Sequence, residues 1–178
     1  MDKHKFSLQP FQPTKFDAKI TSEITRDNHI INFRHELKSD LKKLDVPQIT
    51  DKEARKDELW QTTCFELFIG IENSPRYWEF NISPSGDWNV YRFDDYRQGM
   101  QEERKVESLN IYIDRGFYDL LVRVDKFDLR DLTSENCNFN VSMTAVVKEK
   151  TGNISYWALK HCGEEADFHL RDSFVFAM

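Results

Sequence analysis

The feature of this sequence that most restricts its fold is a repeated alternation of apolar and polar residues with a period of two. Residues 16–24 place apolar or small side chains at every second position, and residues 31–37 alternate again, with Ile31, Phe33, His35 and Leu37 in one row. Arg26, Asp27 and Asn28 lie between the two segments and favour a turn. Because such alternation is typical of a strand with one buried face, these residues predict a β-hairpin.

The same pattern recurs along the rest of the chain, and no sustained helical period appears. Residues 38–58 differ, since they mix charges of both signs and predict a long surface connection with a short helix broken at Pro47. The alternation predicts further strands at 59–71, 77–83, 88–93, 109–114, 117–125, 137–147 and 154–161. About nine strands without intervening helices predict an all-β fold, an antiparallel β-sandwich that forms a single domain over residues 1–178.

The composition restricts the partners of such a domain. Acidic residues outnumber basic ones by 31 to 25, whereas a nucleic-acid binder needs an excess of Lys and Arg. No apolar run approaches the roughly 18 residues of a membrane span, and the first residues lead into no apolar signal segment. Cys64, Cys137 and Cys162 are few and odd in number, which is typical of reduced thiols. We therefore expect a cytoplasmic protein with no nucleic-acid or membrane partner.

The sequence lacks the short motifs that mark common catalytic and cofactor sites. It contains no Gly-rich phosphate loop and no G-x-S-x-G, H-E-x-x-H or C-x-x-C pattern. His161, Cys162 and His169 are residue types that ligate transition metals, but their spacing matches no common zinc pattern. We expect no catalytic residue, no metal site and no cofactor.

Two central segments carry a resemblance to a known family. Residues 59–69 read LWQTTCFELFI, and residues 77–88 read YWEFNISPSGDW. Together they resemble the DOMON-like superfamily, in particular the branch that includes family-9 carbohydrate-binding modules. Residues 156–159 and 166–169 are similar to stand-alone bacterial members that have no assigned function. From Leu59 to the C-terminus, the resemblance implies a β-sandwich that binds sugars or, in other branches, haem.

The resemblance also implies a set of site residues. In its sugar-binding members two Trp rings enclose the ligand, while a Glu bonds the sugar hydroxyls and an Arg takes part. Carried over to this sequence, the rings are Trp60 and Trp157, the acid is Glu66 and the arginine is Arg92. Aromatic faces stack on the C–H faces of a pyranose, and carboxylates form strong hydrogen bonds. On a straight strand Trp60 would lie about 20 Å from Glu66, so it must sit in a preceding loop that folds back.

The strand parity adds further polar groups to this set. Glu66, Glu79 and Asn81 fall on the face opposite the apolar residues of their strands, whereas Trp78 falls on the apolar side and is expected in the core. If the polar face forms a concave groove, these groups bind the hydroxyls of a sugar. If it is plain surface, they are ordinary solvated residues. We predict a non-catalytic domain that binds a small carbohydrate-like ligand through Trp60, Glu66, Glu79, Asn81, Arg92 and Trp157.

Other functions stay open at this stage. An exposed edge strand or aromatic patch would favour a protein-interaction module with a protein partner. Haem binding would need axial ligands facing one cavity, for which Met100 and His169 are conceivable. Glu66 and Glu79 also have the composition of a glycoside hydrolase pair, which would need a defined carboxyl separation.

Overall fold

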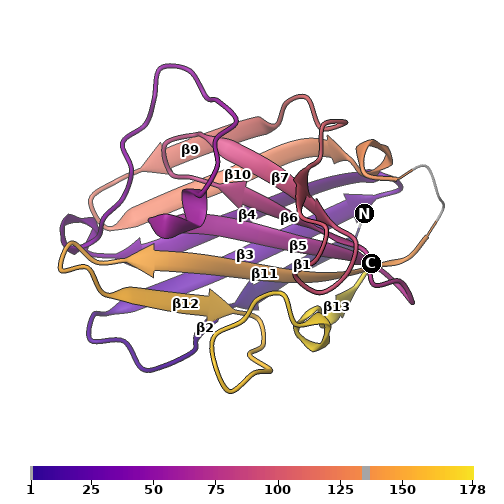
Figure 1. The fold of residues 1–178 in the computed structure, drawn as a ribbon. Helices are drawn as coiled ribbons and strands as arrows, with labels where there is room; N and C mark the ends of the chain where they lie inside the picture. Colours follow the sequence, from indigo (N-terminus) through magenta and orange to yellow (C-terminus); the bar gives the residue numbers. More distant parts are fainter. Residues whose placement is uncertain (1, 134–136) are drawn as a thin grey trace.

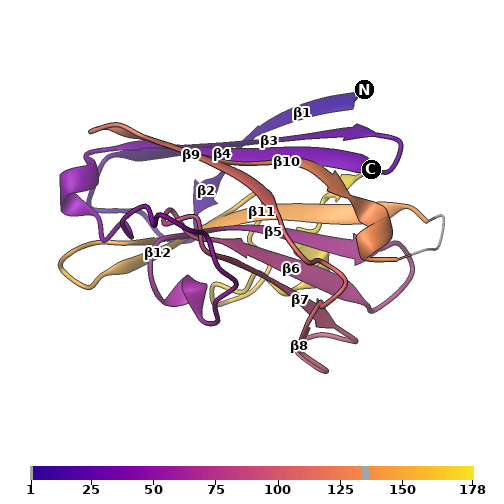
Figure 2. The same cartoon turned by 90° about the horizontal axis from the view of Figure 1, so that it is seen from above.

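Two β-sheets packed face to face make up the fold (Figure 1), and all the pairings between their strands are antiparallel. A computed structural model describes residues 2–133 and 137–178. Seen from above, the sheets form two layers (Figure 2). The predicted all-β antiparallel sandwich is confirmed.

The strands are divided unequally between the two layers. In order across the first sheet they are β1 (Asp2–Ser7), β3 (Ala18–Asp27), β4 (Ile30–Ser39), β10 (Asp119–Asp128) and β9 (Asn110–Arg115). In order across the second sheet they are β2 (Gln9–Pro10), β12 (Ile154–Ala158), β11 (Phe139–Lys148), β5 (Cys64–Ile71), β6 (Tyr77–Ile82), β7 (Trp88–Phe93) and β8 (Gln101–Glu102). A last strand, β13 (Phe176–Ala177), pairs with β11.

Each strand segment predicted from alternation is present, but the structure contains four more. Three of these, β2, β8 and β13, have two residues each, which is too few for a period to be visible. The fourth, β1, mixes Lys3 and Lys5 with His4 and Phe6 and pairs only with β3 at the sheet edge. The sequence therefore predicts the central strands and misses short or edge strands.

The connection between the early hairpin and the central strands contains two short 3-10 turns, of which the first ends before Pro47. The 3-10 turn η1 (Leu41–Lys43) begins after Asp40, whose side chain accepts a hydrogen bond from the Lys42 backbone N–H at 3.2 Å. The other 3-10 turns are η2 (Leu59–Gln61), η3 (Leu129–Asp131) and η4 (Arg171–Ser173). Among the described residues, no helix is long and apolar enough to cross a membrane.

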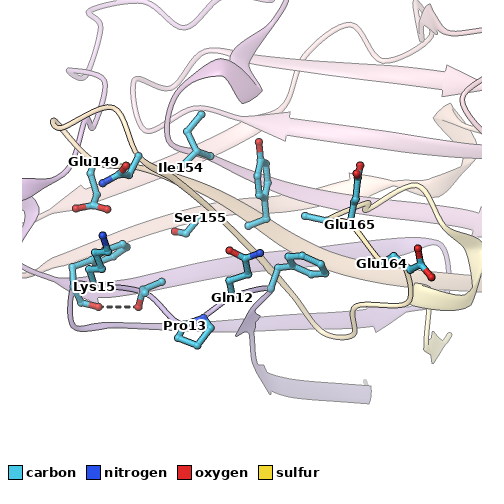
Figure 3. Close-up of a pocket in the computed structure, with 14 residues that line it drawn as sticks. Gln12, Pro13, Lys15, Glu149, Ile154, Ser155, Glu164 and Glu165 are labelled. Atoms are coloured by element: carbon cyan, nitrogen blue, oxygen red, sulfur yellow. Dashed lines mark hydrogen bonds between the residues drawn. The ribbon is translucent and has the colours of Figure 1, made fainter.

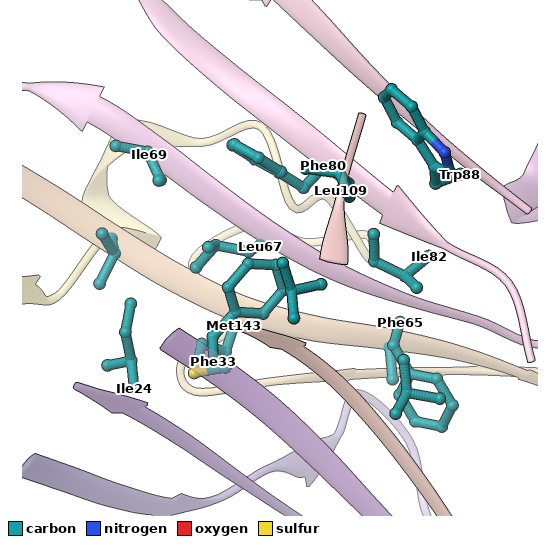
Figure 4. Close-up of a cluster of buried hydrophobic side chains, with 14 of the residues drawn as sticks. Ile24, Phe33, Phe65, Leu67, Ile69, Phe80, Ile82, Trp88, Leu109 and Met143 are labelled. Atoms are coloured by element: carbon teal, nitrogen blue, oxygen red, sulfur yellow. The ribbon is translucent and has the colours of Figure 1, made fainter. Parts of the chain in front are cut away.

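Apolar side chains from the facing sides of the two sheets fill the core (Figure 4). Phe33 of the first sheet meets Phe80 of the second edge to face, with ring centroids 5.9 Å apart. Trp78 lies in this core as expected, and its Nε1–H donates to Glu103 Oε2 at 3.1 Å. The core therefore covers the inner face of the second sheet, and the outer face of that sheet takes no part in it.

Candidate functional site

The outer face of the second sheet carries the polar row that the strand parity predicts. Glu66 on β5 and Glu79 and Asn81 on β6 all point away from the first sheet, opposite to the core residues of the same strands. They are not solvated, because Glu66 is 2% exposed, Glu79 is 5% exposed and Asn81 is fully buried. Of the two alternatives left open for this face, plain surface is therefore excluded.

Irregular segments cover this face and leave a cavity of about 380 Å³ above it. Trp60 enters from η2, which precedes β5, so it lies outside the strand as the distance argument requires. Its ring meets Tyr91 at a centroid distance of 5.8 Å. Arg97 enters from the loop after β7, and Phe168 enters from the C-terminal segment. The cavity thus joins parts of the chain that are far apart in sequence.

Two buried carboxyl groups form the floor of the cavity. Glu66 Oε2 accepts a hydrogen bond from Thr144 Oγ1 at 2.8 Å, and Glu79 Oε1 accepts one from Asn81 Nδ2 at 2.9 Å. In the β5–β6 register Glu66 lies opposite Asn81, and Phe68 lies opposite Glu79. The two carboxyls are therefore diagonal neighbours on adjacent strands.

Burial changes the protonation of this pair. It raises the pKa of the Glu66 carboxyl well above its usual range, and repulsion from Glu79 raises it further. Burial also raises the pKa of Glu79 to about 7, against the opposing effects of the Asn81 hydrogen bond and the Arg97 charge. At neutral pH the pair therefore holds at least one proton.

A second group of polar side chains lines the wall beside Glu79. The hydroxyl of Tyr77 is hydrogen-bonded to His169 Nδ1 at 2.8 Å and accepts from the Arg97 backbone N–H at 3.1 Å. The other ring nitrogen of His169, Nε2, faces Glu79 Oε2 at 3.8 Å. Burial lowers the pKa of His169 to about 4, so the imidazole is neutral at pH 7. The Arg97 guanidinium is bonded to Asp167 at 2.9 Å.

Two of the residues predicted for the site lie elsewhere. Trp157 is 3% exposed and points between the sheets, because alternation along β12 sends it inward and its neighbour Tyr156 outward. Arg92 shares its face of β7 with the core residue Trp88 and lies 3.7 Å from Asp94. Strand parity turns both side chains away from the outer face, so neither lines the cavity as expected. Tyr156 of β12 and Arg97 of the loop after β7 line it instead.

Of the predicted set, the structure therefore brings Trp60, Glu66 and Glu79 together at the cavity, with Asn81 behind Glu79. Sequence reasoning missed the rings of Phe68, Phe93, Tyr156 and Phe168. One signal was present for Phe68, which shares the polar face of β5 with Glu66. A large apolar residue in that row indicates a covered face.

The C-terminal segment that supplies Phe168 and His169 is docked on β5 through a glycine. A Cβ at Gly70 would overlap the Arg171 guanidinium, which lies over that position. Arg171 Nη2 donates to the Ile71 carbonyl at 2.8 Å, and its guanidinium lies 4.6 Å from the centre of the Phe174 ring. The absence of a side chain at position 70 therefore allows this wall of the cavity to close.

We expect the Gly70→Ala substitution to lower the free energy of unfolding by about 1–3 kcal/mol, because it displaces a charged group from its hydrogen bond. Urea denaturation would measure the loss. In an Arg171→Ala background the same substitution should be neutral or slightly stabilising, since the displaced group is gone and alanine suits a strand better than glycine. Additive losses in the double variant would contradict this docking mechanism.

Haem does not fit the cavity, although Met100 and His169 both line it. One imidazole nitrogen of His169 is taken by Tyr77 and the other faces a carboxyl, so an axial bond would need the ring to leave its partners. Among residues 2–133 and 137–178, no three His, Cys, Asp or Glu side chains lie close enough to hold a metal ion. His161 is instead hydrogen-bonded to the Gln9 carbonyl at 2.8 Å.

A second, larger hollow adjoins the cavity (Figure 3). It measures about 600 Å³ and lies between the segment after β2, which includes Gln12, Pro13 and Lys15, and the hairpin at Glu149 and Ile154. Tyr156 and Ala166 line both spaces. The two hollows are therefore neighbours on one face of the molecule.

Comparison with known proteins identifies the fold. A protein of Bacteroides uniformis, to which carbohydrate binding is provisionally ascribed, superimposes with a TM-score of 0.69 at 12% identity, over 97% of this chain and 84% of that one. A family-9 carbohydrate-binding module from Caldicellulosiruptor kristjanssonii, solved in complex with cellotriose, gives a TM-score of 0.50 at 8% identity, over 88% of this chain and 72% of that one. No known family model matches the sequence, and no curated protein sequence matches it. The likeness is one of fold.

Proposed function

We propose that this protein is a non-catalytic domain that binds a carbohydrate or a sugar-like small molecule in the cavity on its second sheet. The observation that carries the proposal is the meeting of Trp60 with the buried carboxyls Glu66 and Glu79 in one cavity. A fold shared with a module solved in complex with cellotriose supports the same ligand class. We further propose that the chain is a DOMON-like domain and that it works in the cytoplasm with reduced thiols.

The chemistry of the cavity suits a sugar. Its volume lies within the roughly 300–1,000 Å³ that small-molecule sites occupy. Trp60 and Tyr156 offer ring faces for the C–H face of a pyranose, and the carboxyls below them offer hydrogen bonds to its hydroxyls. A protonated carboxyl both donates and accepts, so the pair matches hydroxyl groups, which do the same.

We propose binding and not hydrolysis because the fold is shared with a module solved in complex with cellotriose. Glu66 and Glu79 project from neighbouring strands of one sheet face, so both lie beneath a ligand in the cavity. No release of nitrophenol from nitrophenyl glycosides is therefore expected.

We expect Trp60→Ala and Tyr156→Ala each to weaken sugar binding by about 1–3 kcal/mol, by analogy with the loss of one stacking ring in nucleic-acid sites. Isothermal titration with glucose, cellobiose and glucosamine would measure the loss. Tyr112→Ala is a matched control, because Tyr112 is 47% exposed, close to the 38% of Tyr156, and lies on β9 of the other sheet. A chain that binds none of these sugars, or a Tyr112→Ala variant that weakens binding equally, would overturn the proposal.

A further inference from the structure

Acidic side chains outnumber basic ones around the cavity. Three carboxyl groups, Glu66, Glu79 and Asp167, stand near one guanidinium, that of Arg97. Asp167 accepts a hydrogen bond from that guanidinium at 2.9 Å and another from the Tyr96 hydroxyl. His169 is neutral at pH 7, so it adds no positive charge beside Glu79. The two carboxyls on the floor therefore have no cation of their own among the described residues.

Each of these carboxyls keeps one oxygen unused. Glu66 Oε1 and Glu79 Oε2 accept no hydrogen bond from the described residues, although both side chains are more than nine-tenths buried. His169 Nε2 lies 3.8 Å from Glu79 Oε2, which exceeds hydrogen-bond length. Neither oxygen is among the fully buried polar atoms that lack a partner, so both open into the cavity, where a ligand can reach them.

Aromatic rings make up much of the rest of the lining. The rings come from β5, β7, β12, η2 and the C-terminal segment, and they belong to Trp60, Phe68, Phe93, Tyr156 and Phe168. Aromatic faces carry a negative electrostatic potential, so several rings around one space attract a cation. Rings and unused carboxylate oxygens therefore favour the same kind of ligand group, a positively charged one.

We propose that the cavity selects a sugar that carries a protonated amine, with the ammonium group placed at the unused oxygens of Glu66 and Glu79 and the pyranose held among the aromatic rings. This inference rests on the proposed function and names its ligand class, an amino sugar. An ammonium group provides three donors in a compact space, which suits two adjacent acceptors. A neutral sugar brings no charge that would stabilise the ionised carboxyls, and an N-acetylated sugar presents an uncharged amide instead.

Binding of an ammonium group should release a proton from the pair. A cation at these oxygens stabilises the ionised carboxyls, so the proton held in the free protein leaves as the ligand enters. Other titratable or charged groups also face the pair. The strands β5, β6 and β7 contribute Cys64, Tyr77 and Tyr91, while the 94–100 loop and the C-terminal segment contribute Arg97, Asp167 and His169. Burial raises the pKa values of Cys64, Tyr77 and Tyr91, which keeps these groups neutral at pH 7 and leaves the glutamates as the source of the proton.

The test compares glucose, glucosamine and N-acetylglucosamine by isothermal titration at pH 7 in phosphate and in Tris. These ligands share one ring and differ at one substituent. We expect glucosamine to bind at least about tenfold more tightly than the other two, the effect of one charge-assisted hydrogen bond. The heats in the two buffers should differ by the release of about one proton for glucosamine alone.

Variants locate the effect on the two glutamates. Glu66→Gln and Glu79→Gln should weaken all binding and abolish the preference for glucosamine. Glu164→Gln removes the same charge from an exposed residue of the adjoining hollow and should keep the preference. Equal binding of glucose and glucosamine would overturn this inference and leave the proposed function standing. Binding of none of the sugars would overturn the proposed function, and a preference that survives both Gln variants would place the ammonium elsewhere and overturn the inference.

Discussion

Replacing Trp78 with alanine should lower the free energy of unfolding by about 3–5 kcal/mol, the range found when a large buried aromatic residue is truncated. Trp78 is 1% exposed and lies between the sheets. The substitution opens a cavity in the core and also removes the donor that reaches the buried Glu103 carboxyl. Urea denaturation followed by circular dichroism would measure the loss.

Two other variants show whether packing explains that loss. Trp78→Phe keeps most of the ring and loses the hydrogen bond, so it should cost less than alanine does. Trp60→Ala removes the same residue type from the half-buried wall of the cavity and should also cost less. A Trp78→Ala variant that loses less than about 1 kcal/mol would contradict the burial of this ring.

The Glu79→Gln variant should be more stable than the native protein at neutral pH, by an amount that grows with pH. Below the unfolded pKa of 4.5 the native carboxyl is protonated in both states, so the two proteins should differ little. As the pH rises from 4.5 to the folded pKa of about 7, the native protein loses the stability that protonated Glu79 contributes. The substituted amide stays neutral at every pH, so the difference should reach about 3 kcal/mol at pH 7 and above.

The difference between the two proteins is the quantity to measure, because other groups titrate with the opposite sign. Burial lowers the pKa of His35 to about 3 and that of His169 to about 4, so both make the fold more stable as the pH rises toward 6.5. Glu23→Gln is a control for which the change in stability at neutral pH should have the opposite sign. Lys3 and Arg34 lower the pKa of Glu23, so its replacement should destabilise the fold at neutral pH. A Glu79→Gln effect that does not change between pH 4.5 and about 8 would contradict the buried carboxyl.

Local pattern predicts the parts of this fold in which one strand face is buried and the other is polar. Phe33 and Leu37 on β4 are buried as their period requires. The same reasoning does not show whether Tyr156 or Trp157 faces the core, because two adjacent aromatic residues fit the alternation equally well in either orientation of the strand. The pairing of Trp157 with Ala145 on β11 and with Pro10 on β2 sets which ring faces the core.

The walls of the cavity lie beyond local pattern for a different reason. Arg97 reaches the cavity from a loop in which its own backbone is left-handed, with φ of 51°. Phe168 and His169 reach it because Arg171 docks over Gly70, a contact between residues 101 positions apart in the chain. Neither arrangement leaves a periodic signal, so the floor of the site was predictable from the sequence and most of its walls were not.

The floor of the cavity carries its acidic groups, whereas its walls set most of its shape. The acidic groups stand on β5 and β6 in the middle of the second sheet, where a change of backbone would disturb strand pairing on both sides. Most of the wall above this floor comes from irregular segments or from β12, near the edge of the sheet, where a substitution leaves the central pairing intact. Related sandwiches could therefore exchange one ligand for another of the same charge by altering their surface segments alone, while a change in ligand charge would require a mutation in the central strands.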